Sequence, residues 1–88
     1  NTAIWNDGYN LLNNYNYIEQ QAATLQQPIP QAFAKIMKAL HFQYLVDTYG
    51  DVPYTQALQG TGAIAPTYDS SVSIYEDLFK QLDAAITL

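Results

Sequence analysis

Apolar residues recur at intervals of three and four positions in three segments of the chain, residues 2–27, 31–49 and 71–88. This is the period of one face of an α-helix, and the alternation typical of a β-strand is nowhere sustained. The pattern predicts an all-α protein. A helical hairpin comes first, then a long loop over residues 50–70, then a third helix.

Proline and glycine mark the expected ends of the first two helices. We expect Pro28 and Pro30 to end the first helix, because the residue before a proline is driven out of the α-helical region. Gly50 is expected to end the second helix in the left-handed conformation. Pro53 then prevents that helix from resuming.

The third helix is preceded by residues that favour a helix start. Asp69 and Ser70 are candidate N-cap residues, because their side-chain oxygens can accept a hydrogen bond from a free N–H group of the first turn. Ser73 and Glu76 have the spacing of a capping box one turn later.

The second segment is apolar over most of its circumference. A helix of this kind is buried between neighbours. Because 88 residues are too few to cover it on every side, we expect residues 1–88 to form a single partial domain of a longer protein. A start at Asn1 and an end within a helical pattern agree with this expectation.

Charge and composition exclude several classes of function. Eight acidic residues stand against three lysines and no arginine, which gives a formal net charge of -5. This balance disfavours nucleic acid and anionic lipid as partners, since both are bound largely through Lys and Arg. The absence of cysteine excludes a disulfide framework, a thiolate metal site and a cysteine nucleophile.

Few residues are candidates for catalysis or metal binding. His41 has no carboxylate three or four positions away, so we expect a partly buried side chain and not a zinc ligand. Asp47 and Asp51 lack the EF-hand pattern, and a glycosidase pair would rest on residue type alone. Gly60 and Gly62 lack the lysine of a phosphate loop. We therefore expect no catalytic residue, no metal site and no cofactor.

Asp47 is unusual because an acidic residue in the last turn of a helix opposes the helix dipole. We expect its side chain to be buried and to accept backbone N–H groups from residues 50–55. Those hydrogen bonds would lower its pKa.

Two blocks of the sequence resemble the SusD/RagB family. In the first, LVDTYGDVPYTQAL, an apolar helix ends in an aspartate and an aromatic residue, and Gly-Asp-Val-Pro-Tyr follows. In the second, APTYDSSVSIYEDLFKQLDAAITL, Tyr-Asp-Ser opens a helix. The resemblance covers residues 32–88, and residues 2–27 fit the preceding helix loosely. The matching residues are Asp47, Tyr49, Gly50, Asp51, Pro53 and Tyr54, then Tyr68, Asp69, Ser70, Ile74, Tyr75, Leu82, Asp83 and Ala85.

The resemblance implies a cell-surface binding protein that is not a catalyst. Members of the family are outer-membrane lipoproteins of Bacteroidetes-type bacteria that capture glycans and other nutrients. Their fold is a scaffold of tetratricopeptide-like helical hairpins. They act as a lid over a SusC-like TonB-dependent transporter, which is the expected partner together with an oligosaccharide or other nutrient. The lipid anchor would belong to the full-length protein.

Other interpretations stay open from the residues alone. One is a stand-alone tetratricopeptide-like module that binds a protein partner. Another is a fragment of a glycoside hydrolase that uses Asp47 or Asp51. Within the motif, Tyr54 and Tyr68 are either packing residues or contacts to a ligand or to the transporter.

Overall fold

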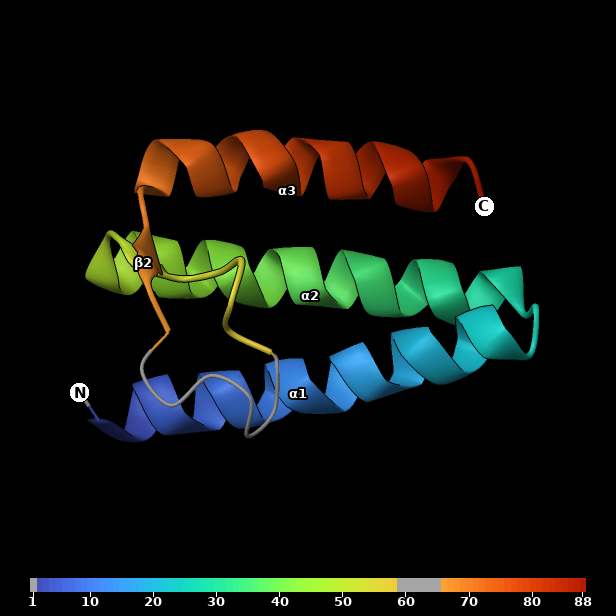
Figure 1. The fold of residues 1–88 in the computed structure, drawn as a ribbon, viewed down its shortest axis with the longest axis horizontal. Coiled ribbons are helices and arrows are strands. Elements are labelled where there is room, and N and C mark those ends of the chain that lie inside the picture. The colour runs from blue at the N-terminus through green and yellow to red at the C-terminus, as the bar shows by residue number, and fades with distance from the viewer. Residues whose placement is uncertain (1, 59–65) are drawn as a thin grey trace.

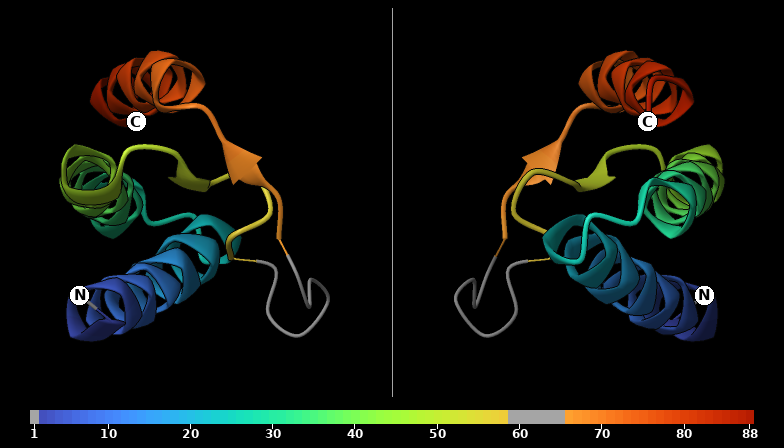
Figure 2. Two further views of the ribbon diagram at one scale, coloured as in Figure 1. Left: turned by 90° about the vertical axis from the view of Figure 1, so that its left-hand side faces the viewer. Right: turned by 90° about the vertical axis from the view of Figure 1, so that its right-hand side faces the viewer.

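In the computed structural model, which describes residues 2–58 and 66–88, three helices lie side by side (Figure 1). They are α1 (Thr2–Thr24), α2 (Pro28–Tyr49) and α3 (Ser71–Ile86), and α2 packs against both of the others. Two short strands, β1 (Val52–Pro53) and β2 (Tyr68–Asp69), pair antiparallel between α2 and α3. The paired strands lie on one side of the helical layer (Figure 2). The predicted all-α, tetratricopeptide-like arrangement of a hairpin and a third helix is confirmed.

The prediction that Pro28 and Pro30 end the first helix is wrong. α1 ends at Thr24, where Gln26 adopts a left-handed φ of 55°. The N–H groups of Gln26 and Gln27 bond back to carbonyl groups of the last turn at 3.1 and 2.8 Å, the pattern of a Schellman motif. Both prolines lie in the first turn of α2, where a helix has no partner for the N–H group that proline lacks.

The second helix ends at Gly50, as predicted, but in a different conformation. Gly50 has φ 82° and ψ -123°, so φ is positive while ψ lies outside the left-handed helical region. Its N–H group donates to the carbonyl of Val46 at 2.8 Å. The chain then enters β1 at once, and Val52 pairs with Asp69 of β2.

Ser70 is the N-cap of α3, as predicted. Its hydroxyl oxygen accepts the backbone N–H of Ser73 at 3.1 Å, and the hydroxyl group of Ser73 donates to the backbone carbonyl of Ser70 at 2.9 Å. The predicted capping box of Ser73 with Glu76 is wrong, because the helix begins one turn earlier and Ser73 is itself the partner of the cap.

The core joins all three helices to β1. The largest fully buried side chains are Leu12 of α1, Leu45 of α2, Val52 of β1 and Ile74 of α3. As expected for a chain too short to cover it on every side, α2 is exposed on the face directed away from the core. The exposed large apolar side chains of α2 are Ile29, Phe33, Ile36, Leu40 and Tyr44. Across residues 2–58 and 66–88, no helix is both long and apolar enough to span a membrane.

Candidate functional site

Asp47 does not hold the bend that follows α2, and the prediction that it is buried and accepts backbone N–H groups is wrong. Its side chain is exposed, and it accepts a hydrogen bond from the hydroxyl group of Tyr75 on α3. This hydrogen bond, together with desolvation, raises the pKa of Tyr75. The positive φ of Gly50 turns the chain into β1, so the N–H groups of the loop find another acceptor.

That acceptor is Asp69, at the end of β2. Its carboxylate accepts the backbone N–H groups of Tyr54 at 2.9 Å and of Thr55 at 3.1 Å, and also the hydroxyl group of Thr55. On the other side of the bend, Asp51 accepts the backbone N–H of Ser71 at 2.9 Å, in the first turn of α3. Two acids of the motif therefore tie the connection to the start of α3.

Tyr54 lies at the junction between the connection and the helices. Its ring packs edge-on against Phe42 of α2, with the ring centroids 4.7 Å apart, and its hydroxyl group donates to the carboxylate of Asp77 on α3. Burial raises the pKa of Tyr54, and the hydrogen bond to Asp77 raises it further. Both ends of this side chain therefore contact the protein itself.

Tyr68 differs from Tyr54 because most of its surface is open. It is 65% exposed, and its ring stacks on Trp5 of α1 at a centroid distance of 6.1 Å and an interplanar angle of 28°. Trp5 also contacts Tyr9 and Tyr49, each with a centroid distance of 5.1 Å. We call Trp5, Tyr9, Tyr49 and Tyr68 the aromatic cluster.

The aromatic cluster is fixed to the bend. The hydroxyl group of Tyr9 donates to the backbone carbonyl of Pro53 at 2.8 Å, and burial raises the pKa of Tyr9. Next to it lies an open cavity of about 380 Å³. The described residues around this cavity are Trp5, Tyr9, Pro53, Ala57, Pro66 and Tyr68. Flat rings and proline side chains make a surface suited to an apolar, planar face of a ligand.

Sequence reasoning did not identify Trp5 and Tyr9 as candidate site residues. The signal available was the only tryptophan of the chain, placed one helical turn before a tyrosine on the same face of the expected first helix. Their proximity to Tyr68 could not be predicted from the sequence. It depends on the pairing of β1 with β2, which brings residues 68–69 back towards α1.

The other candidate groups lie apart from the cluster. The ring nitrogen Nδ1 of His41 lies 2.8 Å from the carbonyl of Met37, and its ring packs on Tyr15. Within the described residues, no group of three or more potential ligands could hold a metal ion. Asp47 and Asp51 are engaged with α3, as given above. Gly60 and Gly62 lie outside the described residues.

Comparison with known proteins gives one match. The sequence model of a SusD-like family, described as starch-binding and associating with the outer membrane, covers residues 1–88. The match therefore includes α1, which carries Trp5. No curated protein and no solved structure matches the chain. Since the family model spans the whole sequence, the chain belongs to the SusD-like family of starch-binding proteins associated with the outer membrane, and it is a binding protein and not an enzyme.

Proposed function

We propose that this chain is part of the helical scaffold of a longer, lipid-anchored SusD-like protein at the cell surface. That protein captures glycan and passes it to a SusC-like TonB-dependent transporter. The family match supports glycan binding at the outer membrane. The observation that carries a ligand-contacting role for this chain is Tyr68, an exposed ring held against Trp5.

The stacked geometry suits a sugar. One face of a pyranose ring presents C–H groups, while the hydroxyl groups lie at its rim. An exposed aromatic ring covers the C–H face, and a phenol hydroxyl group at its edge bonds to the rim. Because Trp5 supports Tyr68 from behind and tyrosine has only two side-chain torsions, little rotamer entropy is lost on binding.

The transporter partnership rests on the family resemblance and on the position of the motif. Tyr54 and the acids Asp51 and Asp69 make the bend rigid, so that Tyr68 is presented in a fixed orientation. A rigid, exposed aromatic side chain is also the type of residue that anchors protein–protein interfaces.

The test compares Tyr68→Ala with Tyr17→Ala in the full-length protein. Tyr17 lies on α1 and is 64% exposed, so the two substitutions remove equally exposed rings. We expect Tyr68→Ala to reduce retention on a starch affinity gel by about tenfold, because one stacking contact is lost, and to reduce nutrient uptake by cells. Tyr17→Ala should behave as wild type.

Tyr54→Ala separates packing from contact. We expect a lower melting temperature, because the contact to Phe42 and the hydrogen bond to Asp77 are lost. If starch retention, uptake and transporter pull-down all survive in Tyr68→Ala, then the ligand- and partner-contacting role proposed for this chain is refuted.

A further inference from the structure

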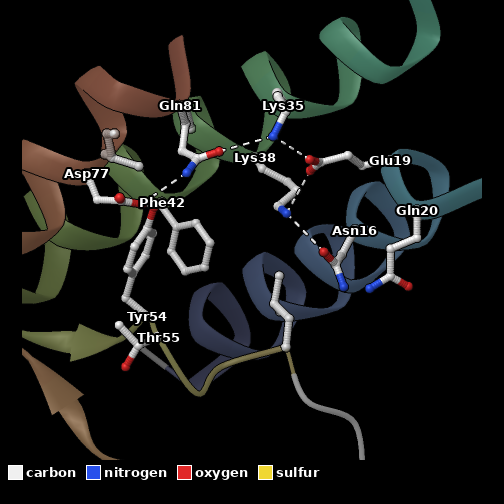
Figure 3. Close-up of a pocket in the computed structure, with 13 residues that line it drawn as sticks. Asn16, Glu19, Gln20, Lys35, Lys38, Phe42, Tyr54, Thr55, Asp77 and Gln81 are labelled. Atoms are coloured by element: carbon white, nitrogen blue, oxygen red, sulfur yellow. Dashed lines mark hydrogen bonds and ion pairs between the residues drawn. The ribbon is translucent and has the colours of Figure 1, made fainter. Parts of the chain in front are cut away.

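A second cavity is lined by all three helices and by the segment after β1 (Figure 3). Its volume is about 410 Å³, within the range of roughly 300–1,000 Å³ typical of small-molecule sites. Unlike the cavity beside the aromatic cluster, it is lined by charged and amide side chains. Two of the three lysines of the protein contribute to it.

One connected network of polar side chains crosses this cavity. Lys35 and Lys38 of α2 each contact the carboxylate of Glu19 on α1, at 2.7 and 2.9 Å. Lys38 also donates to Asn16 at 2.9 Å. On the α3 side, Lys35 donates to Gln81 at 3.3 Å, as Figure 3 shows.

The α3 end of the network continues to the bend. Gln81 donates to Asp77 at 3.3 Å, and Asp77 also accepts the hydroxyl group of Tyr54. The network therefore fixes each polar group before any ligand arrives. Pre-arranged groups of this kind bind with a smaller loss of entropy than mobile ones.

The network is neutral and largely withdrawn from solvent. The side chains of Glu19, Lys35 and Lys38 are only 15%, 17% and 22% exposed. Burial opposes ionisation of Glu19, but the hydrogen bonds and the charges of Lys35 and Lys38 together outweigh burial and lower its pKa. The network holds two basic side chains, Lys35 and Lys38, and two acidic ones, Glu19 and Asp77, so basic and acidic groups are equal in number. An ionic ligand would disturb this balance, whereas a neutral ligand would not.

The network leaves both donors and acceptors unused. Each lysine has three N–H groups, and two of them are engaged in the contacts above. Among the described residues, the Nδ2 group of Asn16 and the Oδ1 atom of Asp77 have no partner. A hydroxyl group donates one hydrogen bond and accepts two, so a polyhydroxylated ligand matches a mixed set of this kind.

The cavity also has an apolar wall. Phe42, Leu58 and Leu78 line it beside the polar groups. An apolar wall that faces fixed amides and charged groups fits a molecule with one C–H face and a hydroxylated rim. From this geometry we infer that the cavity is a second glycan site, which takes a single neutral sugar unit between α1, α2 and α3. This inference rests on the proposed glycan binding and assigns it a site separate from the aromatic cluster.

The test uses D-glucose, because the family is described as starch-binding. The dissociation constant is measured by saturation-transfer NMR on the full-length protein. Asn16→Ala should weaken glucose binding by about tenfold, since the amide that contacts the ligand is lost. The matched control is Asn14→Ala, which removes the same side chain from the exposed face of α1 and should bind as wild type.

Two further variants keep the test decisive. Gln20→Ala removes an exposed cavity side chain that makes no side-chain hydrogen bond within the described residues, so we expect the variant to fold as wild type. It should also weaken glucose binding several-fold. Asn16→Ala should still weaken glucose binding in a Tyr68→Ala background, where the exposed ring of the aromatic cluster is gone, and Tyr68→Ala itself should weaken retention on starch. Glucose binding that is undetectable in wild type, or equally affected by Asn14→Ala and Asn16→Ala, would overturn the second site. Loss of starch retention in Tyr68→Ala would still stand as evidence for the proposed function.

The inference that the ligand is neutral can be tested separately. If D-glucuronate binds more than tenfold tighter than D-glucose in an Asn16-dependent manner, then the inference of a neutral ligand is wrong.

Discussion

Asp69 is the residue on which the geometry of the bend depends. Its position in β2 places its carboxylate beside the segment after β1, where it accepts two backbone N–H groups and one hydroxyl group. A carboxylate with several donors is a strong local constraint, because charge-assisted hydrogen bonds are stronger than neutral ones. The orientation of Tyr54 and the position of Tyr68 both follow from it.

We therefore expect Asp69→Ala to lower the free energy of unfolding by about 1–3 kcal/mol, since the N–H groups of Tyr54 and Thr55 lose their acceptor. Asp47→Ala is the matched control. Asp47 is exposed, and among the described residues its carboxylate accepts one hydrogen bond, from Tyr75, so its loss should change stability by less than about 1 kcal/mol. Urea denaturation of the two variants measures both values. A larger loss in Asp47→Ala would contradict this assignment.

The sequence predicted that an acidic residue accepts the N–H groups of the bend, but it did not show which acidic residue does so. Asp47, Asp51 and Asp69 all belong to the family motif, and Asp47 was chosen because it lies in the last turn of the second helix. The choice of Asp69 is set by the register of β1 against β2, which pairs Val52 with a residue far along the chain. Two-residue strands have no alternation from which that register can be derived.

At the scale of the helices, the apolar period predicted the number and order of elements, but not every boundary. A proline restricts the residue before it and also favours the first turn of a helix, so Pro28 and Pro30 are compatible with either an end or a start. The left-handed φ of Gln26 decides between them, because it ends α1 before the prolines are reached. A glutamine at that position does not predict the end of a helix.

Gly50 gives the clearest prediction at this scale. Its φ of 82° with ψ of -123° is a conformation that L-residues rarely adopt, although an added Cβ would meet no atom within 4 Å. Gly50→Ala should therefore reduce stability by about 1–2 kcal/mol through backbone strain alone. Gly8→Ala is the comparison. Alanine has a higher helix propensity than glycine at this helical position, but its Cβ would lie 3.1 Å from the side chain of Leu45. Thermal melts of both variants should show the larger loss for Gly50→Ala.

Glu19 links α1 to α2, and its lowered pKa makes that link dependent on pH. A carboxyl group whose pKa in the folded state is below its ordinary value of 4.5 stabilises the fold fully at pH values above 4.5. This stabilisation is lost as the pH falls through the pKa of the folded state. Stability should therefore decline as the pH falls below about 4.5. The decline should be shallower in Glu19→Gln, which has no charge to lose. Urea midpoints measured between pH 7 and pH 3 test this, and parallel curves for both proteins would contradict it.

At the scale of the whole molecule, α2 is the middle helix of a layer with only one covered side. The connection and its strands lie on one side of that layer (Figure 2). On the other side, α1 and α2 border a shallow apolar groove. The sequence predicted that α2 needs neighbours on most sides, and this chain supplies only part of them. Which face stays open depends on where α3 packs, and the apolar pattern of α2 does not encode this.

The open groove predicts how the 88-residue chain behaves in isolation. Leu11, Leu40 and Tyr44 line it and are 43%, 50% and 55% exposed, so burial against a second copy would remove apolar surface from water. We expect the apparent mass in sedimentation equilibrium to rise with protein concentration. Leu40→Glu should keep the chain monomeric, because a charge in the groove opposes burial. Val72→Glu adds the same charge on α3 at a residue that is 67% exposed, and it should associate as wild type does.

A wild-type chain that stays monomeric at every concentration and melts in one sharp cooperative step would show that the groove needs no cover. The proposal that residues 1–88 are part of a longer scaffold would then lose its physical basis.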